Sequence, residues 1–309
     1  MFPLNLDKGY MLSELRSNNF RHFNGQTGDR DIIVPKPKGM IRINCLGAST
    51  TASYIFYNGK NYNYPMELEN ILCRAFPDKT IEVNNCGQGG YTSAEILIKF
   101  LLDTINTEPD MIVLYHACND LRASLTDNFE SDYSHSRKNL GEVWHLYRLA
   151  SYIPNLPLAS WNLMVNYCLF SQNVRYSIPN VITRGKPNIK NNFMGLPTYR
   201  RNIEHLIDIC MARGIKVVLS TYCHYLYDAI KNDEWHLKYR EGIKLENEAM
   251  RAIAGKYNLP LVDNDLIFPR EEKYFMDSVH FSHEGMVLLA KNISGPIIDY
   301  IKTLERKPR

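Results

Sequence analysis

The fold is decided by a short stretch near the start of the chain, Ile41-Arg42-Ile43-Asn44-Cys45-Leu46-Gly47-Ala48-Ser49-Thr50. An apolar run of strand length stops at Gly47, and Ser49 follows almost at once. In an open parallel sheet, ligands bind just beyond the carboxyl ends of the strands. A hydroxyl placed there, after a glycine that lets the backbone turn tightly, is a candidate nucleophile. Taken alone, however, the stretch favours a simpler interpretation, in which Ser49 or Thr50 caps the next helix.

The composition is that of an ordinary globular chain with one or two domains. The 309 residues are 45% hydrophobic and 22% charged, with a net charge of +3. Lys and Arg are interspersed with Asp and Glu, so we expect no nucleic-acid partner. Seven cysteines lack a framework spacing, and the N-terminus has no basic region followed by a long apolar core. We therefore expect a cytoplasmic protein without a signal peptide. Prolines and asparagines interrupt the one membrane-like stretch, residues 149–170, so we expect no transmembrane helix.

Strand-like and helix-like runs alternate along most of the chain. After the first strand, further strands are expected over residues 80–84, 110–115, 215–221 and 260–263. The alternation predicts an α/β fold whose five-stranded parallel sheet has right-handed crossovers and helices on both faces. Residues 1–40 are an expected N-terminal extension before a domain over 41–309. Residues from about 128 to 196 break the rhythm and are expected to form a cap-like insertion.

The unusual short motifs all map to one rim of that predicted sheet. Ser49 follows the first strand, residues 87–90 follow the second, Asn119 follows the third, and Asp277 and His280 lie beyond the fifth. This convergence predicts acyl transfer, with His280 as the base for the Ser49 hydroxyl and Asp277 reaching the other ring nitrogen. The glycine backbone and the Asn119 amide provide hydrogen-bond donors for a tetrahedral intermediate.

The same residues resemble the SGNH (GDSL-like) hydrolases, a family named after the serine, glycine, asparagine and histidine of four sequence blocks. The matching blocks are Gly47-Ala48-Ser49, Asn85-x-Gly87-x-x-Gly90-x-Thr92, Asn119-Asp120 and Asp277-x-x-His280. The resemblance covers residues 41 to about 127 and 197 to about 300. It implies a flavodoxin-like three-layer α/β/α sandwich, with Ser49 as the nucleophile and Asp277 and His280 completing a catalytic triad. It also implies an oxyanion hole made by the backbone N–H groups of Ser49 and Gly90 and the side chain of Asn119.

Two positions depart from the family pattern. The acidic residue that the family carries beside the nucleophile is replaced by Ala48, and a usual glycine is replaced by Ala117. The missing acid is not a triad member. Its loss therefore bears on pH dependence and local hydrogen bonding more than on the class of activity.

These observations predict a serine esterase or lipase-like acyl hydrolase that uses an acyl-enzyme intermediate and neither metal nor cofactor. The expected substrate is a small-molecule, glycan or lipid acyl ester, and the resemblance suggests O-acetyl groups on a sugar. Tyr222, His224 and Tyr225, in the loop after the fourth strand, are the expected substrate-binding residues. One alternative is an acyltransferase, in which a sugar hydroxyl replaces water. Another is a non-catalytic glycan-binding module, which Ala48 leaves open.

Two other kinds of site are disfavoured. The glycines of residues 87–90 lack the G-x-G-x-x-G spacing of a dinucleotide-binding loop and follow the second strand rather than the first. His116, Cys118, Cys223 and His224 fall at the ends of the third and fourth strands. They lack the short Cys-x-x-Cys or His-Glu-x-x-His spacing that is typical of metal ligands.

Overall fold

The computed structural model describes residues 32–52, 55–57, 60–133, 135 and 188–305. The chain divides into two compact units, one made of Met1–Leu121 with Leu196–Arg309 and the other of Arg122–Gly195. The first unit holds the main sheet and every predicted site residue.

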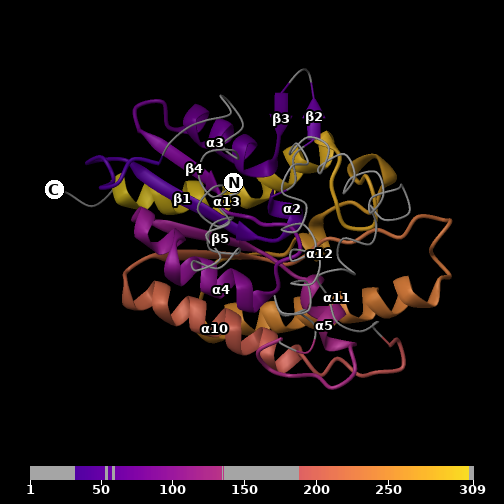
Figure 1. Cartoon of the computed structure of the whole chain (residues 1–309). Coiled ribbons are helices and arrows are strands. Elements are labelled where there is room, and N and C mark those ends of the chain that lie inside the picture. Colours follow the sequence, from indigo (N-terminus) through magenta and orange to yellow (C-terminus); the bar gives the residue numbers. More distant parts are fainter. Residues whose placement is uncertain (1–31, 53–54, 58–59, 134, 136–187, 306–309) are drawn as a thin grey trace, which may run out of the picture. The chain divides into compact units, whose positions relative to one another are not determined.

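The first unit is built on a five-stranded, all-parallel sheet with the strand order β4-β1-β5-β6-β7 (Figure 1). The strands are β1 (Ile41–Gly47), β4 (Ile81–Asn85), β5 (Met111–Tyr115), β6 (Lys216–Ser220) and β7 (Leu261–Val262). The predicted sheet is thereby confirmed, with strand ends that differ by at most one residue. The strand β5 reads as a continuous apolar run and is buried throughout, as expected for a central strand covered on both faces.

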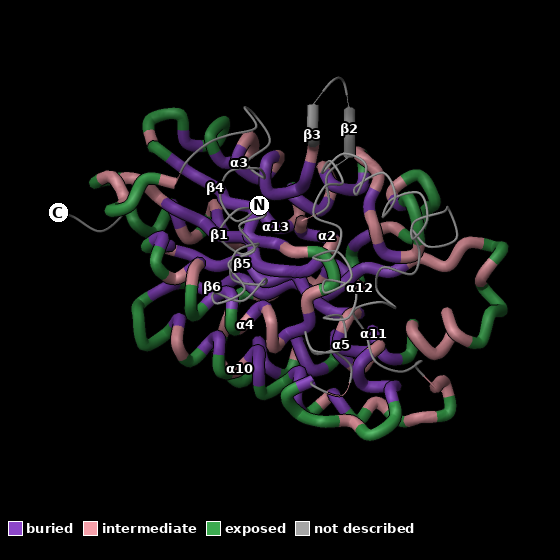
Figure 2. Tube along the Cα trace, viewed as in Figure 1, coloured by how far each residue is buried: buried purple, intermediate pink, exposed green. Residues whose placement is uncertain are grey.

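Helices cover both faces of this sheet (Figure 1). On one face, α3 (Tyr64–Ala75) packs against α13 (His283–Glu305). On the other, α10 (Leu196–Ala212) packs against both α4 (Ser93–Leu102) and α11 (Glu234–Tyr257). The arrangement is the predicted three-layer α/β/α sandwich, and its strands and inner helix faces are buried (Figure 2).

Local sequence signals set where the helices begin. The Asn63 side chain accepts a hydrogen bond from the Met66 N–H at the start of α3, and Pro65 occupies the first turn. At α4, the Thr92 N–H donates to the Glu95 carboxylate over 2.6 Å, as the capping-box spacing predicts.

The segment that follows Ser49 contains secondary structure that we did not predict from the sequence. A short helix, α2 (Ser49–Ala52), is followed by an antiparallel hairpin of β2 (Ile55–Tyr57) and β3 (Lys60–Tyr62). The dipeptide Asn58-Gly59 between these strands is typical of two-residue hairpin turns.

The second unit is described only at its two ends, where the Gly195 N–H donates to Ser124 Oγ over 2.6 Å. The predicted insertion at about 128–196 lies mostly outside the described residues. The same holds for most of the predicted N-terminal extension, residues 1–40.

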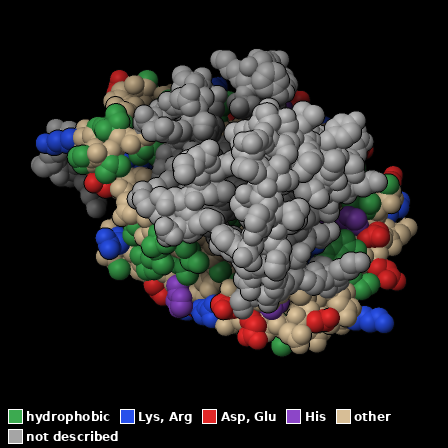
Figure 3. Space-filling model, in the orientation of Figure 1, with side chains coloured by type: hydrophobic (Ala, Val, Ile, Leu, Met, Phe, Trp, Pro, Cys, Tyr) green, Lys and Arg blue, Asp and Glu red, His purple; other side chains and the backbone are tan. Residues whose placement is uncertain are grey.

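Side chains of both charge signs alternate around the described part of the face in Figure 3, in keeping with the small net charge of +3. Among the described residues, we find no helix that combines the length and the apolar character needed to cross a bilayer.

Candidate active site

The turn that carries Ser49 depends on a glycine at position 47. A Cβ atom on Gly47 would lie 2.1 Å from Thr51 Oγ1 and 2.4 Å from the Tyr115 carbonyl oxygen. Because the Tyr115 carbonyl belongs to the backbone of the neighbouring strand, this close approach leaves no room for a side chain at position 47. The turn leaves Ser49 half-exposed at the end of β1 and the start of α2.

Ser49, His280 and Asp277 form a continuous chain of hydrogen bonds. His280 Nε2 lies 2.9 Å from Ser49 Oγ, and His280 Nδ1 lies 2.7 Å from Asp277 Oδ2. A carboxylate accepts only, so Nδ1 carries the proton in this pair and Nε2 is free to accept from the serine hydroxyl. The geometry is that of a base held in the tautomer that proton abstraction requires.

Asp277 is fixed by its own loop as well as by the imidazole. Its Oδ1 accepts the backbone N–H groups of Val279 and His280, each over 2.8 Å. Partial burial is the largest single influence and would raise the pKa of Asp277. The hydrogen bonds and charge of His280, with the Val279 N–H, outweigh it and hold that pKa below its usual value. Asp277 is therefore ionised at neutral pH and can stabilise a positively charged His280.

The loop that carries His280 is tied to the loop after β6. The Tyr225 N–H donates to the Ser278 carbonyl over 2.9 Å, and the Tyr225 ring stacks on Phe275 with centroids 5.4 Å apart. Phe275 also contacts Phe281 at 5.3 Å, and both rings are buried. This aromatic packing positions the base at the carboxyl rim, far along the chain from Ser49.

A hydrogen bond joins α5 (Asn119–Ser124) to the glycine turn after β4, which comprises residues 87–91. Asn119 Nδ2 donates over 2.8 Å to the carbonyl of Tyr91, the residue after Gly90. Gly90 has a φ of +79°, in the left-handed region that favours glycine. Among the described residues, the second N–H of the Asn119 amide has no acceptor, so it can donate to a bound group. The Asn119 amide is thereby held against the residue that follows Gly90.

The glycine turn is also hydrogen-bonded to the segment 47–51, which carries Ser49. The Gln88 N–H donates to the Gly47 carbonyl over 3.2 Å, and Asn85 Nδ2 donates to the Thr51 carbonyl over 2.8 Å. A Cβ on Gly87 would lie 2.3 Å from the backbone of α2, so this close approach also requires glycine. The serine, glycine and asparagine blocks therefore form one hydrogen-bonded assembly.

Behind Asn119, Asp120 is buried in a polar network. Its carboxylate accepts the Ser93 N–H over 2.9 Å and the Ser93 hydroxyl over 2.5 Å, and it lies 2.7 Å from His116 Nε2. All three residues are buried, so the network ties the start of α4 to that of α5. His116 is thereby engaged structurally, and the described residues contain no group of three or more His, Cys, Asp or Glu suited to a metal ion.

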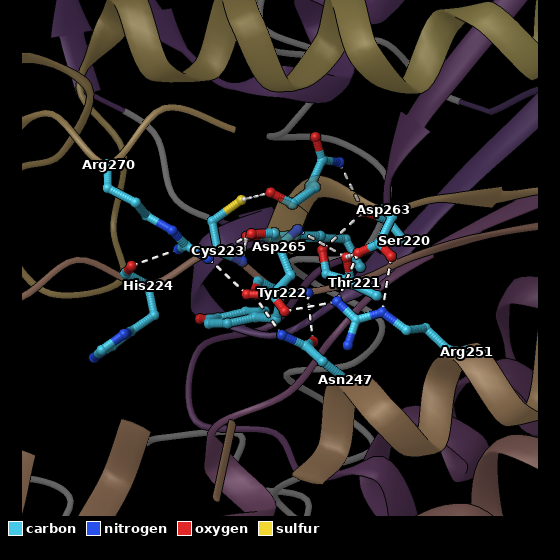
Figure 4. A network of polar contacts seen from close by, with 12 residues as sticks. Ser220, Thr221, Tyr222, Cys223, His224, Asn247, Arg251, Asp263, Asp265 and Arg270 are labelled. Atoms are coloured by element: carbon cyan, nitrogen blue, oxygen red, sulfur yellow. Dashed lines mark hydrogen bonds and ion pairs between the residues drawn. The ribbon is translucent and has the colours of Figure 1, made fainter. Parts of the chain in front are cut away.

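The three residues expected to bind substrate are placed differently from one another. Tyr222 is buried, with its ring stacked on Tyr115 at 4.9 Å and its N–H donating to Asn247 (Figure 4). His224 is also buried, whereas Tyr225 is half-buried beside the His280 loop. Of the three, Tyr225 is the most exposed.

A network of ion pairs joins α11 to the segment 263–270, which follows β7 (Figure 4). The sequence did not indicate this network. Arg251 on α11 contacts Asp263 over 2.7 Å and Asp265 over 2.6 Å, and Arg270 contacts Asp265 over 2.6 Å. Arg270 also donates to the His224 carbonyl. Arg251 lies on α11 and its partners lie in the segment 263–270, so tertiary packing rather than local spacing brings Arg251 to Asp263 and Asp265.

The protonation of His224 provides a test of this arrangement. Burial, with the nearby positive charges of Arg270, Arg240 and His236, lowers the pKa of His224 to about 4. The unfolded chain, with an ordinary histidine pKa near 6.5, then binds more protons than the folded chain between these two values. We expect His224 to cost about 2 kcal/mol of folding stability on acidification from about pH 7 to pH 5.

Urea unfolding of the wild type and of His224→Gln at the two pH values measures this cost. The variant should lose less stability on acidification than the wild type, by about the stated amount. Equal losses in the two proteins would show that His224 is free to take up a proton when folded.

Residues 45–288 match the model of the GDSL-like lipase/acylhydrolase family. No curated protein sequence matches the chain.

Three solved structures illustrate the likeness in fold. A lipase/acylhydrolase from Enterococcus faecalis is 17% identical, with 84% of this chain and 97% of that chain covered and a TM-score of 0.50. The acetyl xylan esterase AlAXEase is 15% identical, with 83% and 100% covered and a TM-score of 0.52. A variant of an acetyl-xylooligosaccharide esterase from Geobacillus stearothermophilus is 16% identical, with 82% and 94% covered and a TM-score of 0.50. At these identities the likeness concerns the fold.

The family model spans well over half of the chain, and the sheet and helices agree with it. The chain belongs to the GDSL-like lipase/acylhydrolase family.

Proposed function

We propose that this protein is a serine esterase that hydrolyses carboxylic esters through an acyl-enzyme intermediate on Ser49. The observation that carries the proposal is the chain of hydrogen bonds from Asp277 through His280 to Ser49 Oγ, with distances of 2.7 and 2.9 Å. A nucleophile, a base and a group that orients the base, each within hydrogen-bond reach of the next, support acyl transfer.

The proposed reaction begins when His280 Nε2 takes the hydroxyl proton as Ser49 Oγ attacks the ester carbonyl carbon. The tetrahedral intermediate then collapses, and the imidazolium donates that proton to the departing alkoxide. A water molecule attacks the acyl-enzyme with the same histidine as base, which releases the acid and restores Ser49. Asp277, ionised throughout, stabilises the charged imidazole.

The negative charge of the tetrahedral intermediate needs donors that are in place before it forms. We assign this role to the backbone N–H groups of Ser49 and Gly90 and to the Asn119 side chain. Support comes from the Asn119 to Tyr91 hydrogen bond, which holds the amide against the glycine turn while leaving its second N–H to donate.

The rim favours a sugar ester over a long-chain lipid ester. Tyr225 and Tyr227 are half-buried, with ring centroids 4.7 Å apart, and they lie beside the Asp277 loop. Amphipathic rings of this kind pair an apolar face with a polar tip, which suits a carbohydrate. Two of the similar solved structures are by name esterases that act on acetylated xylan or xylooligosaccharides. We therefore propose O-acetyl groups on a sugar as the substrate class, with a lipid acyl ester as the alternative.

An ester panel tests the proposed function. We expect the wild type to hydrolyse p-nitrophenyl acetate and acetylated sugars, and to lose activity steeply as the acyl chain lengthens. Release of acetate from the sugar, measured with and without competing sugar acceptors, separates hydrolysis from acyl transfer to a sugar hydroxyl. A wild type that hydrolyses no ester but binds glycan would instead favour the non-catalytic binding module.

A further inference from the structure

We infer that Tyr239 and Glu246 of α11 are positioning residues for the oxyanion donor Asn119, and that they act through the backbone of Cys118. The inference rests on the proposed function, because it assigns residues that hold part of the proposed oxyanion hole. Neither residue belongs to the four sequence blocks, and neither touches the reacting atoms.

Cys118 immediately precedes Asn119 and has an uncommon backbone conformation. Its φ is +74°, in a region that residues with a side chain rarely adopt. Such a conformation persists only where the surroundings hold it. Here it turns the chain sharply between β5 and α5, and the direction of that turn sets where the Asn119 side chain points.

Both polar groups of the Cys118 backbone are bonded to α11. The Cys118 N–H donates to Glu246 Oε2 over 2.9 Å, and the Cys118 carbonyl accepts the Tyr239 hydroxyl over 2.5 Å. Glu246 and the Cys118 side chain are buried, so water cannot easily replace the glutamate. Helix α11 therefore holds Cys118 through hydrogen bonds to both its N–H and its carbonyl group.

Glu246 can accept the hydrogen bond from the Cys118 N–H without carrying a charge. Its burial and the negative charge of Asp120 raise the pKa of its carboxyl well above the usual range, which favours the neutral acid. A neutral carboxyl still offers the carbonyl-type oxygen that the Cys118 N–H needs. A glutamine at this position would offer the same acceptor in nearly the same shape.

Elsewhere on α11, Asn247 holds the loop after β6 in the same way. Its side chain accepts the Tyr222 N–H over 2.7 Å and donates to the Tyr222 carbonyl over 3.0 Å. The same helix therefore fixes two successive strand-end loops by bonding both backbone groups of one residue in each. For the loop after β5, the residue next in sequence is the proposed oxyanion donor.

A double-mutant cycle tests whether Tyr239 acts through Asn119. In the wild-type background, Tyr239→Phe should lower kcat for p-nitrophenyl acetate by about 10- to 100-fold with little change in KM, since small displacements of a catalytic group are costly. In the Asn119→Ala background the same substitution should have almost no effect, because the group that it positions is gone. An equal loss in both backgrounds, or no loss in the wild type, would overturn the inference.

Variants of Glu246 provide the second arm. We expect Glu246→Gln to keep kcat within about threefold, because the acceptor remains, and Glu246→Leu to lower kcat by about as much as Tyr239→Phe. Tyr199→Phe is the matched control, since it removes another tyrosine hydroxyl that donates to a carbonyl of this segment, that of His116, over 3.0 Å. It should leave kcat nearly unchanged in the folded protein. Loss of activity in Glu246→Gln equal to that in Glu246→Leu would contradict a role that needs only an acceptor.

Failure of this inference is distinguishable from failure of the proposed function. A wild type that hydrolyses esters while Tyr239→Phe does so equally well rejects the positioning role alone. If the wild type hydrolyses no ester, hydrogen exchange of the Cys118 amide still tests whether its N–H is bonded to Glu246. That exchange should be faster in Glu246→Leu than in the wild type and unchanged in Glu246→Gln. Equal exchange in all three would reject the Glu246 contact.

Discussion

Replacing Ser49 by alanine should lower kcat for ester hydrolysis on the order of a million-fold, the scale seen when a serine nucleophile is removed from a triad. The substitution removes the only atom that the proposed mechanism acylates, and it leaves His280 without the hydroxyl that lies 2.9 Å from Nε2. KM should change little where it reflects binding, because the remaining rim is intact. Steady-state kinetics with p-nitrophenyl acetate, extended to long times for the variant, measures the loss.

Ser278→Ala is the matched control for that experiment. Ser278 lies between Asp277 and His280 in sequence, and its backbone carbonyl accepts the Tyr225 N–H. Its side chain makes no hydrogen bond within the described part of the chain. The control should therefore retain turnover. A Ser49→Ala variant that keeps more than a few per cent of wild-type kcat would remove Ser49 as the nucleophile.

Replacing Asn119 by alanine should lower kcat by about 100- to 1,000-fold, the usual cost of removing one oxyanion donor. The loss should fall on kcat rather than KM, because the donor bonds the charged intermediate more strongly than the neutral carbonyl. The Asn119 to Tyr91 hydrogen bond of 2.8 Å is lost as well, so thermal unfolding of the variant should be measured alongside its kinetics.

Asn119→Asp separates donation from shape. Aspartate has nearly the same shape as asparagine, but an ionised carboxylate cannot donate and would repel the oxyanion. We expect this variant to be at least as slow as Asn119→Ala. A variant Asn119→Asp that turns over at the wild-type rate would exclude a hydrogen bond from this side chain to the intermediate.

The sheet and most helices could be predicted because their signals are local. The run that becomes β5 is apolar and short, and the Thr92 to Glu95 spacing marks the start of α4 through a bond of 2.6 Å. The hairpin of β2 and β3 was not predicted, because each of its strands is only three residues long and gives little periodic signal.

The candidate triad could be predicted because strand order places the carboxyl ends together, whatever the distance along the chain. Ser49 and His280 are 231 residues apart in sequence, yet the spacing of Asp277 to His280 is local and readable. The residues that hold the candidate site in place through hydrogen bonds and ion pairs could not be predicted in this way. Glu246 and Arg251 look like ordinary polar positions of a long helix, and only packing shows that they hold Cys118 and Asp263.

Tyr222 shows a further limit of sequence reasoning. An aromatic residue in a strand-end loop is a reasonable choice for pocket lining, but composition does not tell a ring that faces ligand from one that packs. The structure stacks Tyr222 on Tyr115, with 2% of its surface exposed. We propose that it supports the rim from beneath, while Tyr225 faces the substrate.

The most direct test of the central claim is covalent labelling with a fluorophosphonate probe, followed by mass spectrometry of the peptides. A serine activated by His280 and Asp277 should take one adduct on the peptide that contains Ser49. The adduct should be absent in Ser49→Ala and should form far more slowly in His280→Ala. A folded wild type that takes no adduct at Ser49 and hydrolyses no ester would contradict the account.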